Sequence, residues 1–294
     1  MKKIGKFFKR LVIIGFLVIL SFFVKEKYIQ PGSAFSSNYE SQYVYLMHRE
    51  SGEEIIKENH EQKAYPASLT KIMTSIVALE EIEDLSAFAP VDVPSYKEMV
   101  ARESSMAGFY GREQTTYRDL LYGTILSSGG EAANSLAVNL AGDRESFVMM
   151  MNEKAEEIGL LDTNFTNPEG LHDPKQYTTA SDMAKLLDYA LEDGDFRAIF
   201  TKRNFKTTAT LDHPDGILLE STVLSKLSDQ SQKDFEIIGG KSGTTSEAGQ
   251  SWITLGVKDK EEYIAVVMGA EFSDMKNREN HQITDTLKLY EAIE

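Results

Sequence analysis

The sequence predicts an α+β fold: one antiparallel sheet built from both ends of the chain, flanked by helices, with an all-helical lobe inserted between its strands. Strand-like segments occur after residue 42 and again after residue 234, and the middle of the chain has the spacing of amphipathic helices. Apolar residues make up 41% of the 294 residues and charged residues 26%, which is ordinary for a globular protein and excludes general disorder.

The early part of the chain predicts a hairpin and then a helix. Two short strands, Tyr43–Leu46 and Glu53–Glu58, flank a turn at Ser51-Gly52. A helix follows over Ser68–Glu83, behind Pro66, because its apolar residues recur at helical spacing.

The middle and the end of the chain complete the predicted fold. Further helices are expected over residues 117–126, 131–141, 143–158 and 180–193. Three strands are expected near the end: Phe235–Ile238, Ser251–Val257 and Tyr263–Gly269. A last amphipathic helix carries Ile283, Leu287, Tyr290 and Ile293. Strands at both ends with helices between them are the pattern of an antiparallel sheet with an inserted lobe.

The N-terminus differs in charge from the rest of the chain. Residues 1–27 carry seven Lys or Arg and one Glu, a net charge of +6, which leaves −21 for the remainder of a chain whose total is −15. The basic cluster precedes an apolar run, Leu11–Val24. A basic flank followed by an apolar run predicts an export signal or a membrane anchor, with its basic end in the cytoplasm; a buried core helix is the alternative. The acidic remainder argues against nucleic-acid binding.

We expect residues 1–28 to be an uncleaved signal-anchor. The apolar run is shorter than the roughly 20 residues that a transmembrane helix needs, but flanking Lys and Arg side chains can reach the membrane interface. The nearest small-residue site, Gly32-Ser33-Ala34, follows Pro31 and is a poor cleavage site. Residues 29–40 then form a polar linker, and residues 41–294 form one domain outside the cytoplasmic membrane. If the signal is cleaved, the domain is secreted.

A Ser-x-x-Lys motif, Ser68-Leu69-Thr70-Lys71, begins the first predicted helix. Residues i and i+3 of a helix share a face, so the hydroxyl of Ser68 and the amine of Lys71 can meet. A lysine acts as a general base only when neutral, and burial or a nearby cation lowers its pKa. A second match, Ser273…Lys276, lies in a polar stretch with no helix to align it.

The context of this motif extends along the chain. The segment Tyr65-Pro66-Ala67-Ser68-Leu69-Thr70-Lys71-Ile72-Met73-Thr74 is followed by Asp119-Leu120-Leu121-Tyr122-Gly123, by Asn167-Pro168-Glu169-Gly170-Leu171 and by Lys241-Ser242-Gly243-Thr244-Thr245. In order and spacing, from about residue 40 to 290, these segments resemble the D-alanyl-D-alanine carboxypeptidases, which are low-molecular-mass penicillin-binding proteins. The resemblance implies a DD-peptidase fold of the β-lactamase-like type, with a catalytic domain over residues 41–294.

The resemblance also implies roles for individual residues. Ser68 would be the nucleophile, Lys71 would take its proton, and Ser128 would relay a proton to the leaving group. Lys241, Ser242, Thr244 and Arg278 would bind the substrate, with Ser242 and Arg278 at its terminal carboxylate and the N–H groups of Ser68 and Thr244 as the oxyanion hole. Simpler alternatives are a helix cap for Ser128, a strand-edge charge for Lys241 and an exposed first-turn residue for Arg278. Gly239, Gly240 and Gly243 suit a close approach of substrate.

Two positions depart from the family's pattern. The third motif is usually Lys-Thr-Gly, and here it is Lys241-Ser242-Gly243, which keeps the hydroxyl. The second is usually Ser-x-Asn, and here it is Ser128-Gly129-Gly130, which lacks the amide side chain. Asn134, one turn later, is a candidate to compensate. Loss of one such polar contact would slow the reaction by about 10²- to 10³-fold if it acts like an oxyanion donor.

The expected function is therefore that of a serine-type D-Ala-D-Ala carboxypeptidase. It would remove the terminal D-alanine from peptidoglycan stem peptides through an acyl-enzyme on Ser68, and β-lactams would be covalent inhibitors. The alternatives are an impaired wall-binding or regulatory pseudoenzyme and a β-lactamase or esterase on the same scaffold. Glu169 invites comparison with the class A β-lactamases, in which a glutamate assists deacylation. No cofactor and no metal site are expected, since the five histidines are scattered and the chain has no cysteine.

Overall fold

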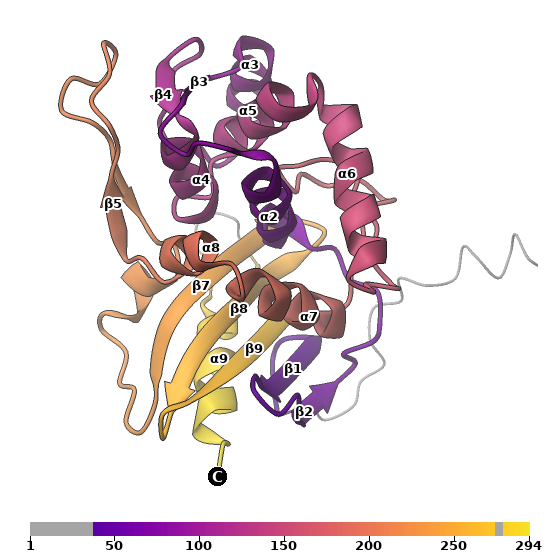
Figure 1. Cartoon of the computed structure of the whole chain (residues 1–294). Helices are drawn as coiled ribbons and strands as arrows, with labels where there is room; N and C mark the ends of the chain where they lie inside the picture. The colour runs from indigo at the N-terminus through magenta and orange to yellow at the C-terminus, as the bar shows by residue number, and fades with distance from the viewer. Residues whose placement is uncertain (1–37, 274–278) are drawn as a thin grey trace, which may run out of the picture. The chain divides into compact units, whose positions relative to one another are not determined.

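Five antiparallel strands form the central sheet, in the order β2-β1-β9-β8-β7 (Figure 1). The structure is a computed structural model that describes residues 38–273 and 279–294. Two strands come from the start of the chain, β1 (Tyr43–His48) and β2 (Glu54–Glu58). The other three come from its end: β7 (Glu236–Thr245), β8 (Gly249–Lys258) and β9 (Glu261–Ala270). The predicted sheet from both ends of the chain is confirmed.

Most of the regular secondary structure between β2 and β7 is helical. They are η1 (Ala67–Thr70), α2 (Lys71–Glu81), α3 (Val93–Ala101), α4 (Tyr117–Ile125), α5 (Gly130–Ala141), α6 (Arg144–Glu157), α7 (Ala180–Leu191), α8 (Gly194–Phe200) and η2 (Leu224–Leu227). Two small hairpins join them, β3 (Phe88–Pro90) with β4 (Gln114–Thr116) and β5 (Asn204–Lys206) with β6 (Leu218–Glu220). The last helix is α9 (His281–Glu291).

The sheet has an apolar core on each of its faces. Along β1, Tyr45 and Met47 join the cluster that contains the inserted helices, whereas Val44 and Leu46 join the cluster that contains α9. This alternation follows from the pleat, which directs successive side chains to opposite faces. Helix α7 packs on β1 and β9, and α9 packs on β8 and β9 from the other side (Figure 1). The sheet is therefore covered on both faces.

Several elements differ from the sequence prediction, among them the start of the first helix, β7 and α3. The helix expected from Ser68 begins as the 3₁₀ turn η1 and continues as α2. Strand β7 extends well past Ile238, where the residue pattern ended the predicted strand, and includes the Lys-Ser-Gly motif. Helix α3 was not predicted, because it buries only Ser95 and Met99 and so has little apolar periodicity. Its start nevertheless carries a signal, since Asp92 accepts a hydrogen bond from the N–H of Ser95 over 2.8 Å.

The predicted signal-anchor, residues 1–28, lies outside the described residues. Among the helices that the structure does describe, none has the length and hydropathy needed to cross a membrane. The domain boundaries therefore stay predictions, and the described residues belong to one compact unit.

Candidate active site

Ser68 and Lys71 meet where η1 passes into α2. The Nζ of Lys71 lies 3.1 Å from the Oγ of Ser68. Both residues sit one turn apart at the start of the helix, as the i, i+3 spacing predicted. The hydroxyl thus has an amine within hydrogen-bond distance that can accept its proton when the amine is neutral.

The surroundings of Lys71 favour its neutral form. The side chain is 1% exposed, and burial lowers the pKa of its amine to about 8, although the carboxylates of Glu169 and Glu131 act in the opposite direction. The same amine donates a hydrogen bond to the backbone carbonyl of Glu169. Lys71 is therefore oriented by two groups and is poised to act as a base slightly above neutral pH.

The backbone beside the nucleophile is strained and closely packed. Ala67 has a φ of 46°, a left-handed conformation that costs a residue with a Cβ about 1–2 kcal/mol. Gly170 lies against it with a φ of 83°, and a Cβ there would approach the carbonyl oxygen of Ala67 to 2.1 Å. Only glycine fits at this place. The loop that supplies the carbonyl of Glu169 is thus held directly against η1.

Ser128 and Lys241 form a second hydroxyl–amine pair. The Nζ of Lys241 donates to the Oγ of Ser128 over 2.8 Å and to the carbonyl of Ser242 over 2.9 Å. Ser128 has a φ of 59° and precedes α5, whose N-cap is Gly129 and has no side-chain cap. Ser128 therefore does not cap this helix, which was the simpler alternative for it.

Lys241 lies on the edge strand β7, but its side chain is buried and is not an exposed strand-edge charge. Its side chain is 0% exposed, and burial together with the charge of Lys71 lowers its pKa well below the usual value. The two lysines thus belong to one electrostatic site. Next along β7, the hydroxyl of Ser242 lies 2.7 Å from that of Thr222, a partner that the sequence did not indicate.

The glycines around Lys241 have two different surroundings. A Cβ on Gly243 would lie 3.2 Å from the N–H nitrogen of Ser68, so β7 runs beside the nucleophile at the point where Thr244 follows. A Cβ on Gly239 would meet Phe200, and one on Gly240 would meet Val223. The close approach expected at Gly239 and Gly240 is thus made by protein side chains.

Two other predicted residues lie apart from these contacts. Arg278 is outside the described residues. Asn134 is fully buried on α5, and its side-chain atoms have no hydrogen-bond partner in the described part of the chain. It makes no contact by which it could replace the amide missing at residue 130. Within residues 38–273 and 279–294, no three His, Cys, Asp or Glu side chains are grouped to hold a metal ion.

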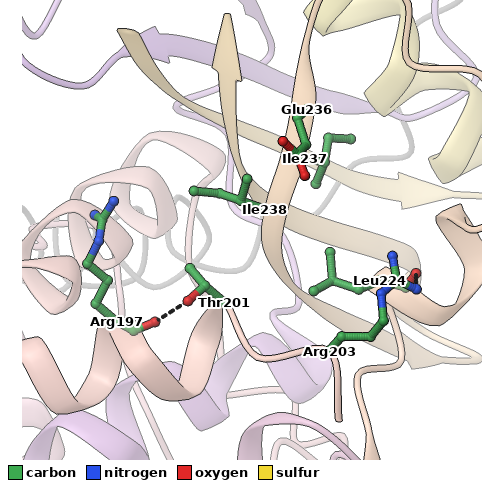
Figure 2. A pocket seen from close by; sticks show the side chains of 7 residues that line it. All are labelled: Arg197, Thr201, Arg203, Leu224, Glu236, Ile237 and Ile238. Atoms are coloured by element: carbon green, nitrogen blue, oxygen red, sulfur yellow. Dashed lines mark hydrogen bonds between the residues drawn. The ribbon is translucent and has the colours of Figure 1, made fainter. Parts of the chain in front are cut away.

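A pocket of about 420 Å³ lies beside the start of β7 (Figure 2). Its lining comes from α8 and the turn after it, from η2 and from the start of β7: Arg197, Thr201, Arg203, Leu224, Glu236, Ile237 and Ile238. Two of the polar side chains bond to backbone carbonyls: Thr201 donates to the carbonyl of Arg197 over 2.8 Å, and Arg203 donates to that of Leu224 over 2.7 Å. None of the candidate catalytic residues lines it.

An α+β fold that holds a Ser–Lys pair with a buried lysine, and a second pair in which Lys241 of the edge strand binds Ser128, is suited to serine acyl transfer. The profile of the peptidase S11 family, D-alanyl-D-alanine carboxypeptidase, matches residues 30–272. The chain belongs to this family, as the sequence indicated.

Curated relatives are similar over most of this chain. The chain is 30% identical to the D-alanyl-D-alanine carboxypeptidase DacC of Escherichia coli K12 over 84% of its length and 61% of the relative's. It is 31% identical to DacD of the same organism over 81% and 60%. The aligned part thus spans somewhat less than two thirds of these relatives.

Solved structures share the fold. A variant of the Streptomyces K15 DD-transpeptidase is 25% identical, with a TM-score of 0.76 over 88% of this chain and 100% of that one. A D-alanyl-D-alanine carboxypeptidase from Mycobacterium tuberculosis is 24% identical, with a TM-score of 0.74 over 90% and 95%. The predicted DD-peptidase fold is confirmed.

Proposed function

We propose that this chain is a serine-type D-Ala-D-Ala carboxypeptidase that removes the terminal D-alanine from peptidoglycan stem peptides. The observation that carries the proposal is the 3.1 Å contact between the Oγ of Ser68 and the Nζ of the buried Lys71. The family to which the chain belongs and the curated relatives that resemble it are named D-alanyl-D-alanine carboxypeptidases, which supports a substrate ending in D-Ala-D-Ala.

In the first step, the Oγ of Ser68 attacks the carbonyl carbon of the penultimate D-alanine while the neutral Lys71 takes its proton. The oxyanion accepts hydrogen bonds from the N–H groups of Ser68 and Thr244. The C–N bond then breaks, and the proton that Lys71 took is relayed through Ser128 to the amine of the leaving D-alanine, so Lys71 is neutral again. This leaves an acyl-enzyme ester on Ser68. Water then attacks the ester while Lys71 takes a proton from it. The ester C–O bond breaks, the proton returns to the Oγ of Ser68, and the shortened peptide is released.

The remaining candidate residues serve substrate binding. Lys241, held by Ser128 at 2.8 Å, keeps a positive potential at the site when protonated. Ser242 and Arg278 are proposed to bind the terminal carboxylate of the substrate. The body of the chain is acidic, so its average field repels an anionic substrate, and these groups supply the local attraction.

We propose an extracytoplasmic location for the catalytic domain, residues 41–294. The basic and apolar pattern of residues 1–28 supports an N-terminal membrane anchor, with residues 29–40 as a linker. Fractionation of cells that produce the full chain tests this. Recovery of the protein in the membrane fraction at its full mass is expected, and a soluble secreted form shortened at its N-terminus would contradict the anchor.

A fluorescent penicillin tests the chemistry. The wild type should carry a covalent label that is absent from Ser68→Ala and retained in Ser127→Ala, a neighbouring serine next to Ser128. Mass analysis of a pentapeptide ending in D-Ala-D-Ala should then find the loss of one D-alanine. An unlabelled wild type would support the pseudoenzyme alternative, and rapid release of hydrolysed penicillin would support the β-lactamase alternative.

A further inference from the structure

The two glycines that follow Ser128 have no room for side chains. A Cβ on Gly129 would lie 2.7 Å from the Cβ of Ala107, and a Cβ on Gly130 would lie 2.7 Å from the Sδ of Met99 and 3.1 Å from the Oγ of Ser104. Contacts between carbon atoms shorter than 3.5 Å are repulsive. The direction in which a residue 130 side chain would project is therefore already filled, by Met99 and Ser104.

Hydrogen bonds fix residues 104–108 in this position. The N–H of Gly130 donates to the carbonyl of Ser105 over 2.8 Å. The buried carboxylate of Glu131 accepts from the N–H groups of Ala107 and Gly108 over 2.7 and 2.9 Å. Such bonds from backbone N–H groups to a carboxylate are strong, so the segment is firmly attached to the first turn of α5.

Ser104 is the serine of this segment whose hydroxyl faces Gly130. Its hydroxyl makes no hydrogen bond within the described residues, and the side chain is partly exposed. Only Gly129 separates Gly130, which Ser104 faces, from Ser128, whose hydroxyl accepts a hydrogen bond from Lys241. Met99, by contrast, is fully buried and has no exposed surface to offer a ligand.

We propose that Ser104 is a substrate-binding residue, whose hydroxyl forms a hydrogen bond with the peptide backbone of the bound stem peptide. It supplies from a neighbouring segment the polar contact that α5 lacks at residue 130. This inference rests on the proposed function, because it names a further residue of the same site. On this interpretation, residues 129 and 130 are glycines because a side chain at either position would overlap the segment that carries Ser104 or Met99 beside it.

Ser104→Ala and Ser105→Ala form a matched pair that tests the contact. Ser105 is exposed and contributes only its carbonyl, which alanine retains. For Ser104→Ala, we expect kcat/KM for the pentapeptide and the rate of penicillin acylation to fall about three- to tenfold, as for the loss of one hydrogen bond, with an unchanged Tm. Ser105→Ala should match the wild type. Equal rates in both variants and the wild type would overturn the assignment.

A second pair of variants tests the packing without any activity measurement. Gly130→Asn should lower the Tm of the wild type. The same substitution should lower the Tm of Met99→Ala by less, because Met99→Ala opens the space that the asparagine needs. An unchanged Tm in Gly130→Asn would contradict the crowding. If the wild type takes no penicillin label and cleaves no peptide, the proposed function is wrong, and so is the role of Ser104. If the wild type is labelled and Ser104→Ala has the same acylation rate and kcat/KM, only the role of Ser104 is wrong.

Discussion

Lys241 donates a hydrogen bond to Ser128 over 2.8 Å, although 113 positions separate the two residues in sequence. The pair joins the edge strand β7 of the sheet to the loop before α5 of the helical lobe. Both side chains are buried, so the hydrogen bond is shielded from competing water. The two parts of the fold therefore meet at a polar contact next to the Ser68–Lys71 pair.

Replacement of Ser128 tests the proton relay. Ser128→Ala removes the hydroxyl that Lys241 binds, so we expect the rate of pentapeptide hydrolysis to fall by about 10²- to 10⁴-fold, as for loss of a general acid–base group. Ser127→Ala is the control and should keep the wild-type rate. A Ser128→Ala enzyme with a wild-type turnover number would exclude the relay.

The pH dependence of acylation tests the state of Lys71. Its pKa is lowered to about 8 by burial, and only the deprotonated amine can take the proton of Ser68. The second-order rate of penicillin acylation should therefore rise about tenfold per pH unit below 8 and level off above it. An acid limb centred near the ordinary lysine pKa, or a flat profile, would contradict this assignment.

A charge-preserving substitution separates the base from the charge. Lys71→Arg keeps the positive charge but cannot be deprotonated in a protein. We expect no penicillin label on this variant at any pH from 6 to 10. Lys63→Arg, at a partly exposed lysine that pairs with Asp162, should label like the wild type. Labelling of Lys71→Arg would show that another group takes the proton.

Gly170 and Gly142 form a matched pair for the packing of the nucleophile. Both have a left-handed backbone, with φ values of 83° and 85°, but a Cβ on Gly170 would approach the carbonyl oxygen of Ala67 to 2.1 Å, whereas one on Gly142 would meet nothing within 4 Å. Gly142→Ala should cost about 1–2 kcal/mol from the backbone alone. Gly170→Ala should cost more and should also lose penicillin labelling, because η1 has to move. Thermal unfolding and labelling measure the two effects; equal losses of Tm would contradict the overlap.

Glu169 is expected to act through its backbone. Its carbonyl accepts the hydrogen bond from Lys71, whereas one oxygen of its buried carboxylate has no hydrogen-bond partner in the described residues. Glu169→Gln should therefore change penicillin acylation by less than about threefold, a small effect of the kind that follows when a main-chain contact is retained. A longer-lived penicillin adduct in the variant would instead assign the carboxylate to deacylation.

The same variant has an expected effect on stability. Burial raises the pKa of Glu169, so ionising this group in the folded protein costs free energy once the pH exceeds the pKa of the unfolded chain. Glutamine carries no such cost. The Tm of Glu169→Gln relative to the wild type should thus increase from pH 4 toward neutral pH, and a decrease over this range would show that the ionised carboxylate stabilises the fold.

The sequence determined the parts of this protein that depend on local spacing and on ordered motifs. The i, i+3 positions of Ser68 and Lys71 placed them on one helix face, and the observed distance of 3.1 Å agrees. Alternation and helical periodicity predicted a sheet from both ends of the chain with helices between. Thr116 capped α4 and Thr179 capped α7 close to the predicted starts of these helices.

Only the tertiary structure decided the surroundings of these groups. The burial of Lys71, its hydrogen bond to the carbonyl of Glu169 and the contact between Ser128 and Lys241 join residues about a hundred positions apart. The crowding at Gly130 also cannot be predicted from the sequence, which shows only that the usual asparagine side chain is missing. In the structure, Met99 and Ser104 fill the space that this side chain would take. Local periodicity sets which side chains share a face, but desolvation and long-range contacts depend on how the elements pack, and these set the pKa values and the shape of the site.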